Sequence, residues 1–340
     1  MIFNRFLATT LGAFSLLLSI PALAEQPPKL IFPVDCTLNE DCWFIQHPDV
    51  DPGDGFRDYG GFTRSYNGHN GVDIGISDIA AIDEGFLVLA PADGRVLRAR
   101  DGMVDEAVRT KEARDAIYDR ACGNAVVLSH AGGLETQICH MRQGSVLVQP
   151  GQIVEAGDPI GEIGMSGLAE FPHIQLSTRL NGVHVDAATG KPLKPEDADK
   201  VPNPTPLWGD AELTAYDPLD IVQIGFGTAA LTADKALDGR AHVRAAATDP
   251  PALVVWTVIY GTQPGDRLTM TILDPVGDKF FDNEIELEEQ KVRIFRFSGR
   301  RVRQPLDPGV YTGRITIERG EGETAFRETK QTTIRIEPAG

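Results

Sequence analysis

Three short segments of this 340-residue chain hold residue types that bind metal ions or carry protons. The first places His69 four residues before Asp73, the second ends on His140, and the third places His173 two residues before Gln175. Alternate side chains of a strand share a face, so His173 and Gln175 are expected to project the same way. Imidazole and carboxylate groups are favoured zinc ligands, and histidine is the usual proton carrier near neutral pH. Together the segments indicate a zinc-hydrolase-like site.

The chain's other histidines give no such pattern. His130 falls at a predicted turn, and His47 and His184 have no motif around them. A single histidine is more often structural than functional, so these three are expected to be structural.

The elements around the three segments are predicted to be strands. Aliphatic and β-branched residues recur in short runs separated by Gly, Pro and Asp, which is typical of an all-β domain. The predicted strands lie at 71–74, 86–89, 94–97, 124–128, 136–140 and 174–176. We expect them to form an antiparallel β domain over residues 67–189.

Two stretches interrupt or extend this domain. Residues 103–121 are rich in Ala, Glu, Asp and Arg, with Asp105 and Arg109 at helical spacing, so a surface helical insertion is predicted there. Residues 151–164 repeat glycine and an aliphatic residue, which predicts a tightly turned pair of strands. Lipoyl and biotinyl carrier domains have similar runs, but no lysine occurs between Lys111 and Lys191, which excludes a carrier.

The two ends of the chain have different character. Residues 1–24 combine Arg5, an apolar run and an Ala-Leu-Ala site, so we expect a cleaved signal peptide rather than a membrane anchor, and hence export to the periplasm or outside. Residues 25–66 are predicted to be irregular, and the prolines of 190–214 indicate a linker. Alternation such as that of 268–272 predicts an antiparallel sheet, so residues 215–340 are expected to form an immunoglobulin-like β-sandwich.

Net charge and cysteine content indicate which classes of partner and which redox compartment to expect. The formal charge of −17 argues against nucleic acid and anionic lipid as partners. Four cysteines in an exported chain favour disulfides, and the local pairs Cys36–Cys42 and Cys122–Cys139 are preferred among three connectivities. A structural zinc site is the alternative, but no C-x-x-C spacing supports it.

With these residues in place, the middle of the chain resembles the lysostaphin-type zinc metalloendopeptidases, which cut peptides of peptidoglycan. The resemblance covers about a third of the chain and includes the 151–164 repeat. Four segments match in order: 68–74, 90–96, 123–130 and 172–176. It implies the duplicated hybrid motif fold of that family for the β domain.

The resemblance also implies a role for each site residue. His69 and Asp73 match two zinc ligands of the family, and His140 and His173 match its two catalytic histidines. Gln175 stands where the family has its third zinc ligand, a histidine. A neutral amide oxygen is a poor donor to zinc, so weaker binding of the Zn²⁺ cofactor is expected.

Three functions remain open from the sequence. The first is a zinc endopeptidase acting on peptidoglycan peptides, supported by four of the five expected site residues. The second is a degenerate peptidase domain that binds peptidoglycan or regulates another hydrolase, supported by Gln175. The third places the working surface on the C-terminal sandwich, through which another envelope protein would bind. We rank them in that order.

Overall fold

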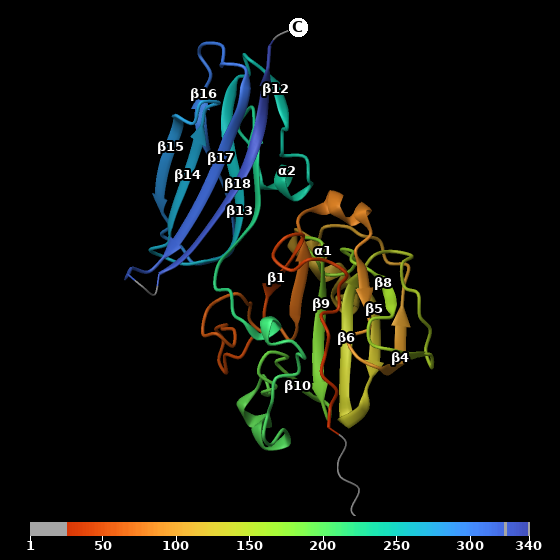
Figure 1. The fold of residues 1–340 in the computed structure, drawn as a ribbon. Helices are drawn as coiled ribbons and strands as arrows, with labels where there is room; N and C mark the ends of the chain where they lie inside the picture. Colours follow the sequence, from red (N-terminus) through yellow and green to blue (C-terminus); the bar gives the residue numbers. More distant parts are fainter. Residues whose placement is uncertain (1–25, 323–324, 339–340) are drawn as a thin grey trace, which may run out of the picture.

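A computed structural model describes residues 26–322 and 325–338. The predicted signal peptide at 1–24 lies outside these described residues. None of the helices in the described ranges is long and apolar enough to cross a bilayer. The chain forms two β-rich domains, one built from residues up to about 214 and a C-terminal sandwich beyond it (Figure 1). The predominance of antiparallel strands confirms the predicted all-β class.

The N-terminal domain is organised around one large antiparallel sheet, with a second sheet of two strands, β3 and β8. The order in the large sheet is β1-β2-β9-β6-β5-β4-β7, and β10 pairs with β9. Its strands are β1 (Cys42–Gln46), β2 (Val72–Ile76), β3 (Leu87–Leu89), β4 (Gly94–Arg100), β5 (Asn124–Ser129), β6 (Leu134–Met141), β7 (Ile153–Val154), β8 (Pro159–Glu162), β9 (His173–Leu180) and β10 (Val183–Val185). Short 3-10 turns join them: η1 (Ile79–Glu84), η2 (Tyr118–Arg120), η3 (Ala131–Gly133), η4 (Pro195–Lys200) and η5 (Ala211–Thr214).

The strands that carry the predicted site lie in the centre of this sheet. Strand β2 is buried along its whole length because β1 and β9 pair with its two edges. Strands β5 and β6, predicted at 124–128 and 136–140, form a hairpin, and the Cys122–Cys139 disulfide ties its open end. The second predicted disulfide, Cys36–Cys42, is also present. Both predicted pairings are therefore confirmed.

The insertion before β5 is less helical than predicted. The helix α1 spans Lys111–Ile117, with Thr110 as its N-cap, and it ends in the turn η2. Residues 103–110 are instead extended along the domain, because the Asp105 carboxylate accepts hydrogen bonds from the backbone of Gln143 and Met165. A helix across this part would remove those bonds, so the predicted 103–121 helix is wrong in its first half.

The C-terminal domain is a two-sheet sandwich. One sheet has the order β11-β13-β16 and the other β12-β18-β17-β14-β15. Its elements are β11 (Asp220–Gly227), α2 (Ala233–Leu237), β12 (Ala245–Ala247), β13 (Ala252–Thr262), β14 (Arg267–Leu273), β15 (Lys279–Glu286), β16 (Lys291–Arg301), β17 (Gly309–Arg319) and β18 (Phe326–Glu337). Inward side chains of both sheets form a continuous apolar core. The immunoglobulin-like assignment stays a prediction.

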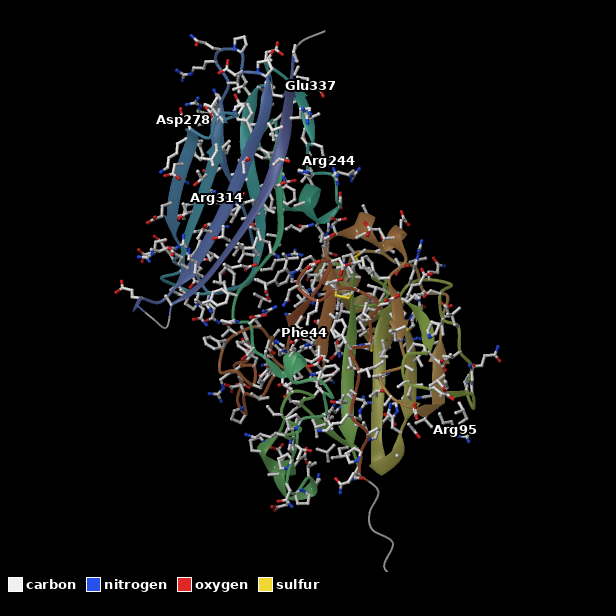
Figure 2. All side chains as sticks on the ribbon, viewed as in Figure 1. Phe44, Arg95, Arg244, Asp278, Arg314 and Glu337 are labelled. Carbon is white, nitrogen blue, oxygen red and sulfur yellow. A yellow bond between two sulfur atoms is a disulfide. The ribbon has the colours of Figure 1, made fainter. Side chains whose placement is uncertain are left out.

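The two domains share an apolar interface. Trp43 and Ile45 of β1 pack with Trp256, Val258 and Tyr260 on the outer face of the three-stranded sheet. This interface lies at one end of the sandwich, whereas the side chains labelled Asp278 and Glu337 in Figure 2 stand at the other end. The sandwich is therefore held against the N-terminal domain by its own sheet face and not only by the linker.

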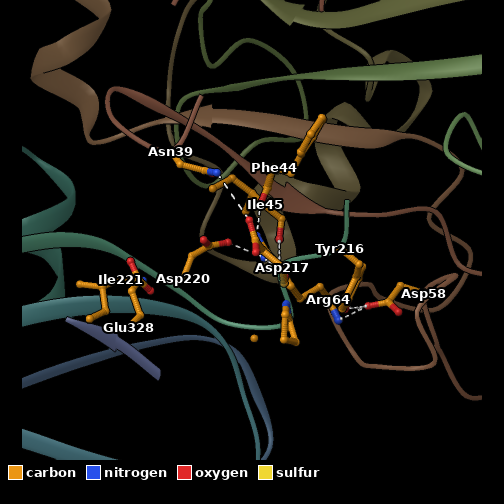
Figure 3. Close-up of polar contacts among 12 residues, drawn as sticks. Asn39, Phe44, Ile45, Asp58, Arg64, Tyr216, Asp217, Asp220, Ile221 and Glu328 are labelled. Carbon is orange, nitrogen blue, oxygen red and sulfur yellow. Dashed lines mark hydrogen bonds and ion pairs between the residues drawn. The ribbon is translucent and has the colours of Figure 1, made fainter. Parts of the chain in front are cut away.

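A buried arginine fixes the same junction (Figure 3). Arg64 is 1 % exposed and donates to the carbonyl oxygens of Phe44 and Ile45 on β1. It also donates to the Asp217 carbonyl and forms an ion pair with Asp220, the first residue of β11. A buried guanidinium with this many partners sets one relative position of the two domains.

Candidate active site

A cleft of about 520 Å³ opens where the two domains meet. Asp73, His140 and His173 line it from the N-terminal domain, and Tyr260 and Arg293 line it from the sandwich. Asp73, His140 and His173 thus come from strands β2, β6 and β9, which the sheet brings side by side, and His69 precedes β2. The cleft is a composite of both domains, which the sequence did not reveal.

Four of the five predicted site residues form one contiguous row. His69 Nε2 lies 3.3 Å from Asp73 Oδ1, and His173 Nε2 lies 3.9 Å from Asp73 Oδ2. The rings of His173 and His140 follow, with centroids 4.7 Å apart. All four residues are buried. His69 lies deepest, beneath the ring of Tyr66 at a centroid distance of 4.4 Å.

The carboxylate of Asp73 is the centre of this row. Burial acts to raise the pKa of Asp73, but the neighbouring His69 and His173 outweigh burial and hold that pKa below its ordinary value. The carboxyl group is therefore ionised at neutral pH. An ionised carboxylate between two imidazoles has the charge and the position of a cation ligand.

His140 is held in an unusual backbone conformation. Its φ of +64° lies in the left-handed region, which is uncommon for a residue other than glycine and is concentrated at functional sites. The His140 N–H donates to the Cys122 carbonyl, and the disulfide joins Cys122 to the adjacent Cys139. The disulfide and this hydrogen bond together stabilise the turn that aims His140 into the cleft.

The tautomers of both cleft histidines follow from their partners. Nδ1 of His140 contacts the Ser166 carbonyl at 2.8 Å, and Nδ1 of His173 contacts the Phe171 carbonyl at 2.8 Å. A carbonyl only accepts, so each Nδ1 carries the hydrogen, and the neutral form of each ring has its lone pair on Nε2. Burial, and secondarily the nearby His173, lowers the pKa of His140 to about 3, so His140 is neutral at pH 7.

The turn that supplies the Ser166 carbonyl depends on a glycine. A Cβ on Gly123 would lie 2.3 Å from the Ser166 oxygen, so only glycine admits this close approach. The Ser166 hydroxyl also donates to the Met141 carbonyl. Sequence analysis did not identify Ser166, although the glycines on either side of this stretch were a signal of a tight packing site.

Gln175 occupies the position next to Asp73 in the sheet. It lies directly across from Asp73 on β2, and its amide nitrogen donates to Asn70 Oδ1 at 2.9 Å and to Ser177 Oγ at 3.0 Å. A Cβ on Gly71 would come 2.7 Å from Gln175 Cγ, so glycine allows the side chain to cross β2 toward Asn70. The amide is therefore engaged in a polar network beside the carboxylate.

The donor atoms of His69 and Asp73 fit a zinc ion. A tetrahedral zinc with bonds of ~2.0–2.1 Å places neighbouring ligand atoms ~3.3–3.4 Å apart, as His69 Nε2 and Asp73 Oδ1 are. Both atoms are buried, and neither has a hydrogen-bond partner among the described residues. Leaving buried polar atoms unpaired is unfavourable, and a cation between them would satisfy both.

This site differs from a zinc site with three protein ligands at the third ligand position. Within the described residues, no further His, Cys, Asp or Glu places a ligand atom within 4.8 Å of those of both His69 and Asp73. The three-residue cluster of that kind at Cys36, Asp41 and Cys42 has its two cysteines in a disulfide. The donor set that fits zinc is therefore the pair His69 and Asp73.

The histidines expected to be structural make contacts of that kind. His130 uses both ring nitrogens, one with the Asp93 carbonyl and one with Thr136 Oγ1, each at 2.8 Å. His184 Nε2 accepts from Arg179. None of them lines the cleft.

Comparison with known proteins agrees with the resemblance. The family model described as Peptidase family M23 matches residues 67–187. The DD-carboxypeptidase/endopeptidase Mpg of Neisseria meningitidis serogroup B is 32% identical over 127 residues, which are 37% of this chain and 24% of that protein. The peptidoglycan DD-endopeptidase ShyC of Vibrio cholerae is 28% identical over 101 residues, 30% of this chain and 21% of that one. The chain thus spans about a quarter or less of the length of these relatives.

Two solved peptidase structures are similar to part of this chain. A zinc-containing peptidase from Vibrio cholerae has 21% identity and a TM-score of 0.30, covering 47% of this chain and 39% of that one. The catalytic domain of lysostaphin from Staphylococcus simulans has 22% identity and a TM-score of 0.26, covering 40% of this chain and 77% of that one. The family assignment rests on the sequence match over residues 67–187. Residues 67–187 of this chain are a peptidase family M23 domain.

Proposed function

We propose that this protein is an exported, zinc-dependent endopeptidase that hydrolyses peptide bonds of peptidoglycan. The observation that carries the proposal is the buried pair His69 Nε2 and Asp73 Oδ1, 3.3 Å apart and unpartnered among the described residues, beside two cleft histidines. Two relatives, a DD-carboxypeptidase/endopeptidase and a peptidoglycan DD-endopeptidase, support peptidoglycan peptides as the substrate class. Export rests on the signal-like residues 1–24.

The proposed chemistry divides between the ion and the protein. A zinc ion held by His69 and Asp73 would act as a Lewis acid on the scissile carbonyl and make water more acidic. With Nδ1 bonded to a main-chain carbonyl, His140 and His173 each keep Nε2 free for proton transfer, so the unprotonated form of either ring can take a proton from the attacking water. The water oxygen joins the carbonyl carbon, the C–N bond breaks, and the proton passes to the leaving amine.

The protein also prepares the site for this reaction. The four site residues are buried, which excludes bulk water and strengthens the electrostatic contacts to a bound peptide. The hydrogen bonds from Nδ1 of both histidines keep their rings from rotating before substrate arrives. Histidine tautomer and orientation are therefore fixed in advance by main-chain carbonyls.

A second candidate function has its own observation. The Gln175 amide is engaged with Asn70 and Ser177, and among the described residues the donor set that fits zinc is the pair His69 and Asp73. A domain with this donor set supports binding of peptidoglycan, or regulation of another hydrolase, without cleavage. The cleft would then recognise the peptide but lack a retained metal ion.

Digestion of purified peptidoglycan separates the two candidates. The full chain is incubated with peptidoglycan in zinc-containing buffer, and soluble muropeptides are measured by chromatography and mass spectrometry. Release that stops with chelator and returns with zinc supports the endopeptidase. Pelleting of the protein with peptidoglycan, without release at any zinc concentration, supports the binding module and overturns the enzyme.

A further inference from the structure

The sandwich contributes a charged side chain to the catalytic cleft. Arg293 on β16 lies directly across from Tyr260 on β13, and both side chains line the same cleft as Asp73 and His173. Arg293 is half-buried, and its guanidinium carbon lies 5.8 Å from the centroid of the Phe171 ring. The arginine therefore reaches from one domain to the site of the other.

The charges that line the cleft leave this guanidinium without a counter-ion. Arg114 of α1 forms an ion pair with Glu170, so those two charges offset each other. Asp73 faces His69 and His173. Among the described residues, Arg293 has no carboxylate oxygen within ion-pair distance. A partly desolvated arginine in this position provides an anion-binding group.

We propose that Arg293 binds a free carboxylate of the substrate peptide beside the scissile bond. This inference rests on the proposed function, because it assigns part of the substrate to the same cleft. A guanidinium donates two parallel hydrogen bonds to a carboxylate, which fixes orientation as well as charge. The chain carries a formal charge of −17, so its overall field disfavours anions and a local cation is needed to hold one. The sandwich thereby becomes a specificity element of the peptidase.

The surrounding contacts keep Arg293 in place without substrate. Its strand belongs to the sheet whose outer face packs on Trp43 and Ile45 of β1, and Arg64 fixes the same junction through Asp220. The recognition group therefore has a defined position relative to the site. A strand held in one position lowers the entropy cost when Arg293 binds the carboxylate.

The position of Phe171 between Arg293 and His173 decides which substitution the test uses. The Phe171 ring beneath Arg293 stacks on His173, with centroids 4.4 Å apart and planes inclined by 26°. Removing Arg293 could therefore disturb His173 and lower turnover of every substrate. Arg293→Met keeps the long stem over Phe171 but removes the charge. Loss restricted to carboxylate substrates indicates recognition, whereas equal loss for all substrates indicates support of His173.

The test compares soluble cross-linked muropeptides with the same muropeptides whose carboxylates are converted to carboxamides. For the wild type we expect the amidated form to have a KM roughly tenfold higher or more, the scale of one charge-assisted contact. Arg293→Met should lose that difference, because its KM for the carboxylate form rises to the KM for the amidated form. Arg296→Met, at an exposed position three residues along the same strand and outside the cleft, is the control and should keep the difference.

Binding of the same two probes distinguishes failure of this inference from failure of the proposed function. If the wild type cleaves neither form, calorimetric affinities replace KM, and a preference for the carboxylate form that Arg293→Met abolishes still supports Arg293. Equal affinity of the wild type for both forms, or an undiminished preference in Arg293→Met, overturns the inference. Cleavage without discrimination overturns it too and leaves the endopeptidase standing.

Discussion

The strands of the sandwich run for up to 12 residues, whereas those of the N-terminal domain hold two to eight. The domains also differ in how completely their polar groups are satisfied. Within the described chain, every buried side-chain polar atom without a hydrogen-bond partner belongs to a residue before 190. The non-glycine residues with positive φ likewise all precede the sandwich, and His140 is among them.

This difference separates a scaffold from a site. A sequence that follows its local rules throughout gives a stable domain, and departures from those rules concentrate where a protein binds or reacts. His69 and Asp73 carry three of the unpartnered buried atoms, and they adjoin the two cleft histidines. The sandwich contributes to function by position, through the side chains at its interface end.

The largest effect is expected from one buried aspartate in each domain. Asp73→Asn should lower muropeptide release at least ~1,000-fold, because the ion loses its carboxylate ligand, while changing stability less. Asp266→Asn should lower the stability strongly and change muropeptide release less. That residue is 1 % exposed and forms a bidentate pair with Arg319, so breaking the pair should cost ~3–5 kcal/mol of unfolding free energy.

Chemical denaturation and initial rates per folded molecule measure the two effects separately. If Asp73→Asn lowers the free energy of unfolding as much as Asp266→Asn does and keeps its activity, the division between site and scaffold is contradicted.

The two disulfides offer a contrast within the N-terminal domain. Replacing both Cys122 and Cys139 by serine should reduce stability by ~3 kcal/mol for a loop of this length and lower activity several-fold, because the turn at His140 loses its support. Replacing Cys36 and Cys42 should reduce stability by ~2 kcal/mol and leave activity per folded molecule intact. Thermal unfolding and muropeptide release test both. Equal effects of the two pairs on activity would show that the link to His140 is not used.

Stability should depend on pH through Asp186 of the N-terminal domain. Burial raises the pKa of this carboxyl from 3.8 to about 6. The folded chain then holds the proton more tightly than the unfolded chain, so this contribution is complete below about pH 4 and is lost as pH rises through about 6. Asp186→Asn cannot ionise and still accepts the Thr189 N–H. Its unfolding free energy relative to wild type should rise by roughly 2–3 kcal/mol from pH 4 to 7; parallel pH profiles would contradict this.

Much of the fold could be predicted because its signals are local. The strands β5 and β6, the alternation of 268–272 in strand β14 and both disulfides follow from short runs and spacing. The strand β11, with glycines at 225 and 227, lacks the alternation that identified its neighbours and was not predicted. In the insertion, the backbone N–H groups of Gln143 and Met165 donate to the Asp105 carboxylate, and these distant contacts outweighed the helical composition.

The site was predictable only in part for the same reason. His69, Asp73, His140 and His173 were predicted as site residues because each stands in a short motif, and the fold brings them into one row. Arg293 was not found because its place in the cleft depends on how the two domains dock. Domain docking is set by side chains far apart in the sequence, such as Arg64 with Asp220.

The substitution Gln175→His, which has the smallest expected effect, tests most directly the central claim that His69 and Asp73 hold a zinc ion. Gln175 lies across from Asp73, and the proposed zinc ion has two strong protein ligands among the described residues, His69 and Asp73. Zinc titration by calorimetry, on chains stripped of metal, should show that Gln175→His binds zinc ~10–100-fold more tightly than the wild type. Gln137→His, the same change at a half-buried position of the neighbouring strand β6, should leave the affinity unchanged. If Gln175→His binds zinc no more tightly than the wild type, residue 175 does not face the ion and the two-ligand site at His69 and Asp73 is wrong.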